Sequence, residues 1–217
     1  MDKIKKLLPH IRQSVVVTLV LMLVCGLLFP LLLQGISQLL FNHQANGSLI
    51  EVNGQVIGSE LVGQEFTQPY FMKGRPSAVH YNTYKEDENG NKTLSDGSEF
   101  GGVASGSQNL AASNPELKKR VEKDIEKFLK DNPDVKKEDI PTDLLTASGS
   151  GLDPHISPES AAVQLPAISE ASGISVEKLQ KIVEKNTKGK LLGLFGEETV
   201  NVLLVNLDIA QEMGLLK

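Results

Sequence analysis

The segment from Asp143 to Pro158, DLLTASGSGLDPHISP, gathers the side chains in this sequence that are best suited to chemistry. Ser148, Ser150, Asp153 and His155 are the residue types of a serine hydrolase, in which histidine accepts the proton of a serine nucleophile. Triad members usually converge from separate segments, because the base must approach the nucleophile from the side. The sequence also lacks a G-x-S-x-G turn. We therefore assign no catalytic residue, and a hydrolase using Ser148 or Ser150 with His155 is only the alternative hypothesis.

The same segment has a simpler interpretation as a rigid turn. Gly149 and Gly151 permit unusual backbone angles, and Asp153 or Ser157 is suited to cap a following helix. Asp153 and His155 supply only two metal ligands, fewer than a metal site needs. We therefore expect a structural or docking loop and no metal site.

Two further clusters are candidates for docking. YFMKGRPSA, residues 70–78, combines two aromatic side chains with a lone arginine, a composition typical of protein interfaces. It is equally consistent with aromatic core residues and an arginine paired to a carboxylate. SGSQNL, residues 105–110, by itself predicts an ordinary loop that enters a helix. The candidate residues in the two clusters are Arg75, Pro76, Ser77, Ser105, Gly106, Gln108 and Asn109.

The N-terminal quarter of the chain determines where these motifs lie. No Asp, Glu, Lys or Arg occurs between Arg12 and Glu51, and Val15 to Leu33 is almost wholly aliphatic. A helix of that length rises about 29 Å, which matches a hydrocarbon core of about 30 Å. A cleaved signal peptide would have a shorter apolar region and a small-residue cleavage site, which this run lacks. We predict an uncleaved membrane helix in contact with lipid.

Charge sets the expected orientation. Three lysines and one arginine precede the apolar run, so the positive-inside rule places the N-terminus in the cytoplasm. Residues 13–217 then contain 18 basic and 26 acidic residues, a net charge of −8, which argues against nucleic acid as a partner. The only cysteine, Cys25, lies in the apolar run, so no intrachain disulfide is possible.

The remaining sequence predicts a mixture of helices and strands. Asn53-Gly54 within residues 48–57 predicts a type I′ hairpin. Residues 81–106 suggest a long exposed loop, and Asn114 to Lys130 an amphipathic helix. Further helices are expected after Ser157, with a break at Pro166, and after Ser175. Residues 199–205 (TVNVLLV) predict a buried strand, with a short helix after it.

These elements give the predicted fold class: a single N-terminal transmembrane helix plus one mixed α/β extracytoplasmic domain. We expect a cytoplasmic stub over residues 1–12, a transmembrane helix over 13–34, a juxtamembrane segment over 35–47 and the extracytoplasmic domain over 48–217. Without a credible active site, such a chain is expected to be an accessory or interaction subunit rather than an enzyme.

Taken in order along the chain, the motifs resemble one family. The apolar span is followed by GSLIEVNGQVIGSELVGQEF, YFMKGRPSA, SGSQNL, SGSGLDPHISP and VNVLLVN, the last of which contains Asn201. This pattern is similar to the C subunit of the Kdp potassium-transporting ATPase, and the similarity covers essentially the whole chain. SGSGLDPHISP is its most specific part.

That resemblance implies an accessory subunit in the bacterial cell membrane. Its implied partners are a channel-like potassium-binding subunit and an ATP-hydrolysing P-type subunit. It implies a role in assembly and, as a catalytic chaperone, in raising the ATP affinity of the P-type subunit. The family counterpart of SGSQNL is implied to contact nucleotide.

The predicted topology bears on that nucleotide contact. If residues beyond Gln34 lie outside the cell, SGSQNL does not meet cytoplasmic ATP, and residues 1–12 contain no phosphate loop. We therefore expect no tightly bound cofactor, and an effect on ATP affinity that is allosteric.

Overall fold

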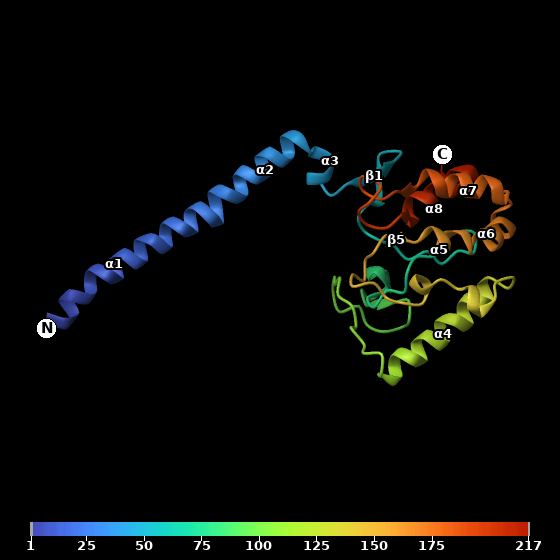
Figure 1. Ribbon diagram of the computed structural model, residues 1–217, viewed down its shortest axis with the longest axis horizontal. Coiled ribbons are helices and arrows are strands. Elements are labelled where there is room, and N and C mark those ends of the chain that lie inside the picture. The colour runs from blue at the N-terminus through green and yellow to red at the C-terminus, as the bar shows by residue number, and fades with distance from the viewer. Residues whose placement is uncertain (1, 217) are drawn as a thin grey trace. The chain divides into compact units, whose positions relative to one another are not determined.

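The computed structural model describes residues 2–216, with side chains described from His10 to Leu216. The chain divides into two compact units, Met1–Leu49 and Ile50–Lys217. The first is almost entirely helical, and the second mixes helices with short strands (Figure 1). The mixed helix and strand content predicted for the second unit is confirmed.

The first unit is built on one long helix. Helix α1 (Asp2–Leu23) continues through a π-helical turn, η1 (Val24–Leu28), into α2 (Phe29–Leu40), and the short α3 (Asn42–Ala45) follows. Residues His10–Leu40 form a helix that is long and apolar enough to cross a membrane, and none of its most apolar window is buried by described residues. Helical structure thus reaches well into the stretch predicted as juxtamembrane.

The π-helical turn has a local cause in the sequence. Pro30 has no backbone N–H to donate, and its ring would collide with the carbonyl group of Gly26 in the preceding turn. A π-helical turn widens the backbone at such a position without ending the helix. Leu23 and Phe29, which flank the turn, keep helical backbone angles. The helix therefore remains continuous past the proline.

Two small hairpins precede the core of the second unit. Strands β1 (Leu49–Val52) and β2 (Gln55–Ser59) pair around Asn53-Gly54, whose φ values of 54° and 77° fit the predicted type I′ turn. Strands β3 (Tyr84–Glu86) and β4 (Lys92–Leu94) form the second hairpin.

The second hairpin corrects the expectation of a long loop over residues 81–106. The Gly, Asn and charged residues of this region obscured two short strands. Tyr84 stacks on Phe100 with ring centroids 4.6 Å apart, and the Lys92 ammonium lies 4.6 Å from the Tyr84 ring centroid. Contacts between aromatic rings and lysine therefore stabilise a hairpin whose residues are mostly exposed.

The core lies around a three-stranded antiparallel sheet and the helices that follow it. Strand β7 (Thr199–Asn201) lies between β5 (His155–Ile156) and β6 (Thr187–Lys188), and His155 is opposite Asn201. Helices α5, α6, α7 and α8 pack in this part of the unit, with α7 touching the other three (Figure 1). Their bounds are Pro158–Ala162, Leu165–Ser172, Val176–Lys185 and Val202–Glu212. Fully buried core residues include Met72, Leu179, Val200, Val205 and Ile209.

Helix starts follow the predicted capping residues. Helix α4 (Pro115–Asp131) begins after Asn114, which accepts a hydrogen bond from Glu116 N at 2.9 Å. Ser157 caps α5 and Ser175 caps α7, each accepting from the residue three positions on. The predicted break at Pro166 is confirmed as the boundary between α5 and α6, with the proline in the first turn of α6. Three 3₁₀ turns, η2 (His80–Asn82), η3 (Lys137–Asp139) and η4 (Thr142–Leu144), complete the described elements.

The prediction of a strand over residues 199–205 is wrong beyond Asn201, where a helix begins instead. The Asn201 side chain accepts a hydrogen bond from Leu204 N at 3.1 Å, and the chain turns there into helix α8. A short apolar run fits a buried strand and a buried helix equally well, so its pattern did not separate the two. The capping asparagine inside the run was the signal that a helix begins.

Two buried side-chain amides hold the extended segment that leads to Arg75. Asn206 of α8, 2% exposed, donates to Met72 O at 2.9 Å and accepts from Met72 N at 2.7 Å. Gln164 donates to Lys73 O at 3.2 Å and accepts from Lys73 N at 2.8 Å. Each amide satisfies both backbone groups of a residue that belongs to no strand, as a neighbouring strand would.

Candidate functional site

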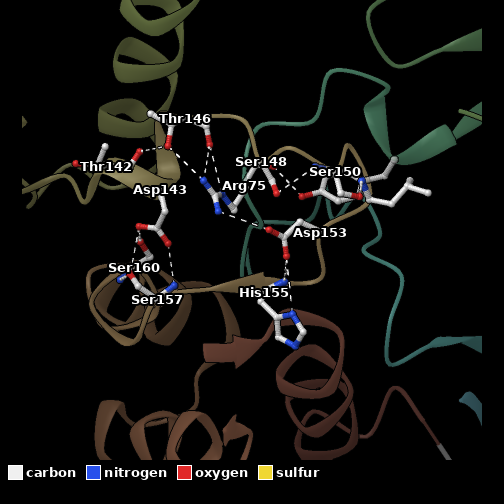
Figure 2. A network of polar contacts seen from close by, with 12 residues as sticks. Arg75, Thr142, Asp143, Thr146, Ser148, Ser150, Asp153, His155, Ser157 and Ser160 are labelled. Carbon is white, nitrogen blue, oxygen red and sulfur yellow. Dashed lines mark hydrogen bonds and ion pairs between the residues drawn. The ribbon is translucent and has the colours of Figure 1, made fainter. Parts of the chain in front are cut away.

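A polar network brings together the RPSA segment and the SGSGLDPHISP segment, which are far apart in the sequence (Figure 2). At its centre the Arg75 guanidinium lies 3.5 Å from the Asp153 carboxylate and donates to Thr146 O at 3.3 and 3.4 Å. The Arg75 and Asp153 side chains are 25% and 21% exposed. Of the two interpretations open for Arg75, pairing with a carboxylate is therefore correct.

The aromatic residues beside Arg75 also take structural positions. The Phe71 ring packs against Tyr70 and Phe66, with centroid distances of 4.7 and 5.5 Å, and Phe71 joins the edge of the hydrophobic core. The buried amides hold Lys73, whose pKa burial lowers to about 8. The segment before Arg75 is thus held by the packing of Phe71 and by the hydrogen bonds to the backbone of Met72 and Lys73.

Asp153 links Arg75 to His155. One Asp153 oxygen faces Arg75, and the other accepts from the His155 backbone N–H at 3.0 Å and lies 3.8 Å from the ring nitrogen Nδ1. Burial lowers the pKa of His155, and the nearby Asp153 carboxylate only partly opposes that shift. His155 is therefore held as a mainly neutral ring beside a carboxylate that Arg75 already neutralises.

A second carboxylate, Asp143, organises the start of helix α5. It accepts from Ser157 N at 2.8 Å, from the Ser157 hydroxyl at 3.2 Å and from the Ser160 hydroxyl (Figure 2). A carboxylate near a helix N-terminus also interacts favourably with the helix dipole. Asp143 therefore fixes the η4 turn against the first turn of α5.

Ser77 and Gly151 join a third segment to the network. The Ser77 hydroxyl donates to Gly151 O at 2.6 Å, and Gly151 N donates to Ser105 O at 2.9 Å. A Cβ on Gly151 would lie 2.9 Å from Gly106 O and 2.6 Å from Val79 Cγ2. Glycine is therefore required at position 151, because the chain at 105–106 passes too close for any side chain.

The chain after Ser77 adopts a left-handed turn. His80, Tyr81 and Asn82 have φ values of 48°, 52° and 55°, which non-glycine residues rarely adopt. Ser77 Oγ accepts from Tyr81 N at 3.0 Å, and Tyr81 Oη donates to Arg75 O at 2.7 Å. Burial raises the pKa of Tyr81 well above its usual range, so the hydroxyl stays protonated and able to donate. These contacts offset the strain of the turn.

One side of the network opens into a cavity of about 540 Å³. Five carboxylates line it, those of Asp143, Asp153, Glu159, Glu197 and Glu198, against the single guanidinium of Arg75. The electrostatic potential inside the cavity is therefore expected to be negative. Among the described residues, no group of three or more His, Cys, Asp or Glu side chains is placed to hold a metal ion.

The geometry gives no support to the hydrolase alternative. The hydroxyl of Ser148 accepts from Ser150 N at 3.3 Å, and that of Ser150 accepts from Leu152 N at 3.2 Å. Figure 2 shows the His155 ring pointing away from both serines, and no hydrogen bond joins it to either of these described residues. Both serines stabilise their own loop, as expected for a structured turn.

The remaining predicted residues take separate positions. Asn201 donates to Glu60 O at 2.8 Å and caps α8, so it supports the sheet beside His155. Gln108 and Asn109 are exposed, and Asn109 has a φ of 50°. Of SGSQNL, only Ser105 and Gly106 meet the network. Pro76 connects Arg75 to Ser77, the two residues of this segment whose side chains join the network.

The SGSQNL segment does not fit a phosphate site. A phosphate cradle places backbone N–H groups at a helix N-terminus directly after the loop. Here helix α4 begins at Pro115, and the Asn114 side chain already accepts from its first turn. The segment also contains no Lys or Arg.

Sequence analysis missed several residues that hold the site together: Asp143, Thr146, Ser160, Tyr81, Gln164 and Asn206. Asp143 is the first residue of the segment whose side chains are best suited to chemistry, so its position gave a signal. The two amides gave no local signal, because their partners lie 91 and 134 residues away in the sequence.

Comparisons with known proteins agree with the order of the motifs. Residues 11–211 match a family model described as KdpC, the K⁺-transporting ATPase c chain. A potassium-transporting ATPase KdpC subunit of Clostridium kluyveri is 64% identical over 206 residues, covering 94% of this chain and 95% of that protein. The counterpart in Clostridioides difficile is 61% identical over 211 residues, covering 95% and 99%. That of Caldanaerobacter subterraneus is 45% identical over 204 residues, covering 94% and 96%.

Replacing Gly151 by Ala is expected to lower the free energy of unfolding by about 1–3 kcal/mol, because the added methyl group overlaps Gly106 O and Val79. Gly149→Ala is the matched control, since a Cβ there meets nothing within 4 Å. Urea denaturation of the full chain in mild detergent, followed by circular dichroism, measures both. Equal stability of the two variants would show that residues 105–106 do not pack on Gly151.

The lowered pKa of His155 predicts a pH effect on stability. The unfolded chain binds a proton at the ordinary pKa of 6.5, whereas the folded chain binds it only at lower pH. Stability is therefore lost as pH falls below the unfolded value. Between about pH 7.5 and about pH 5.5, wild type is expected to lose more stability than His155→Gln.

Denaturation midpoints at several pH values test this expectation. His10→Gln is the control, because His10 lies in the exposed N-terminal helix. Parallel pH profiles for wild type and His155→Gln would contradict the lowered pKa of the half-buried His155 ring.

Proposed function

This chain belongs to the KdpC family, the c chain of the K⁺-transporting ATPase, and on that basis we propose that it is a non-catalytic accessory subunit of a potassium import pump. The observation that carries the proposal is the match over residues 11–211, which includes the long apolar helix and every motif of the second unit. In this proposal the partners are a channel-like potassium-binding subunit and a P-type ATP-hydrolysing subunit.

The proposed location is the bacterial cell membrane. The helix His10–Leu40 would cross the bilayer once, with the basic N-terminal residues in the cytoplasm. Its exposed Val and Leu side chains suit lipid or the helices of other subunits. The second unit would then lie outside the cell.

The proposed role is to stabilise the assembled pump and to raise the ATP affinity of the P-type subunit. The Arg75 network supports a structural role, because its polar groups bond one another and tie together segments around residues 75, 105 and 153. A rigid unit of this kind can present fixed surfaces to partners. No nucleotide contact by this chain is proposed, and the effect on ATP would pass through the other subunits.

The pump assembled with and without this chain tests the proposal. Purified complexes are assayed for potassium-stimulated ATP hydrolysis over a range of ATP concentrations. Without this chain, we expect either failure to recover the other subunits together or a raised KM for ATP. Normal assembly with an unchanged KM in its absence would refute the proposed role.

Orientation has a separate test. Alkaline phosphatase, which is active only outside the cytoplasm, is fused after Lys217 and is expected to be active. The same enzyme fused after Arg12, ahead of the apolar run, is the control and is expected to be inactive. Reversed activities would place the second unit in the cytoplasm and reopen direct contact with ATP.

A further inference from the structure

An apolar knob projects from the second unit between strands β6 and β7. It consists of Leu191, Leu192, Leu194 and Phe195, which are 70%, 82%, 78% and 62% exposed. Single exposed apolar residues are ordinary on protein surfaces, but contiguous apolar patches mark interaction sites. The knob contributes nothing to the core or to the Arg75 network, so its exposure needs another explanation.

The knob is a preformed structure. Leu191 N donates to Phe195 O at 2.8 Å, and Phe195 N donates to Leu191 O at 3.0 Å. Leu192 and Gly193 turn the chain with φ values of 54° and 72°. Because these backbone hydrogen bonds are made within the loop, the apolar side chains can enter a partner without leaving those groups unpaired.

An apolar groove of about 640 Å³ lies beside the knob. Its apolar lining comes from α5, α6 and α7. Thr187 and Gly189 also line it, and Gly189 lies two residues before Leu191 of the knob. The apolar residues are Pro158, Ala162, Leu165, Pro166, Val176 and Val183. This face therefore combines a protruding loop with a groove. A folded partner protein can be complementary in shape to both, whereas a fluid bilayer cannot.

Charged residues border the face in two groups. Lys188 and Lys190 precede the knob, Glu197 and Glu198 follow it, and Glu184 and Glu198 border the groove. None of these five described residues forms an ion pair with another described side chain. Mixed charges around an apolar centre are typical of a protein interface. An anionic bilayer would attract the lysines but repel the glutamates.

We propose that the knob and the groove together form a docking face for another subunit of the K⁺-transporting ATPase. Charge complementarity defines the partner surface: an apolar socket whose rim carries charges of both signs for the knob, and an apolar ridge beside a basic side chain for the groove. The inference rests on the proposed function, because membership in a multisubunit pump supplies the occupant.

Recovery of the pump through a tagged copy of this chain tests the docking face. The variant Leu192→Asp/Leu194→Asp is compared with wild type in the full complex. The matched control is Leu61→Asp/Val103→Asp, since those side chains are 61% and 84% exposed and lie elsewhere in the sequence. We expect the knob variant to recover the other subunits about tenfold less well, and the control to match wild type.

A charge reversal provides a second, milder test. Lys190→Glu leaves the apolar residues intact and is expected to weaken recovery about threefold or more, with a stronger effect at low salt. Circular dichroism of each purified variant confirms that the fold is retained. A knob variant that retains its fold and recovers the other subunits as well as wild type does would overturn the inference.

The outcomes separate this inference from the proposed function. If wild type recovers no other subunit, the proposed function itself fails. If wild type and knob variant recover them equally, only the docking face fails. Two further measurements are made with wild type and the knob variant: pairing of two differently tagged copies, and binding to vesicles of phosphatidylethanolamine and phosphatidylglycerol. A knob-dependent loss in either one, with subunit recovery intact, would assign the face to a second copy or to lipid and overturn the inference.

Discussion

The second unit depends on hydrogen bonds from buried side chains to backbone that lies outside any sheet. Asn206 bonds both backbone groups of Met72, and Gln164 does the same for Lys73. Such bonds are needed because buried backbone N–H and C=O groups are costly to leave unpaired, and the strands here are only two to five residues long. The segment held in this way leads directly to Arg75, which pairs with Asp153.

The same need to pair polar groups explains why a segment rich in Ser, Asp and His forms a turn that its own hydrogen bonds hold in place. In the stretch from Asp143 to Ser160, the side chains of both aspartates and all four serines bond a neighbouring backbone group or another side chain of the network. A nucleophile needs a base aimed at it, and here His155 lies beside Asp153 and away from the serines. The polar groups of this segment therefore bond one another and fix the shape of the turn.

The two units meet opposite physical demands. The helix His10–Leu40 exposes its apolar side chains along its length, as a segment in lipid or among other helices must. The second unit buries or partly buries most of its large apolar side chains, and the knob at residues 191–195 is the main departure from that rule. This departure is informative because the four apolar residues lie within one five-residue loop, which is closed by backbone hydrogen bonds and bordered by charge.

Sequence alone determined the features that depend on neighbouring residues. The apolar run, the type I′ hairpin at Asn53-Gly54 and the caps at Asn114, Ser157 and Ser175 follow from local chemistry, and the structure shows the helix and the caps where they were expected. The order of the motifs also identified the family, because their succession is far more specific than any one of them. Sequence failed at residues 199–205, where an apolar run fits strand and helix alike until Asn201 caps α8.

Tertiary structure decided everything that depends on distant pairs. The partners of Arg75, Gln164 and Asn206 lie between 71 and 134 residues away, and no local pattern encodes them. The need for glycine at position 151 arises only because residues 105–106 pass against it. The orientation of the His155 ring, beside Asp153 and away from Ser148 and Ser150, also depends on packing, since residue types define only what chemistry is available.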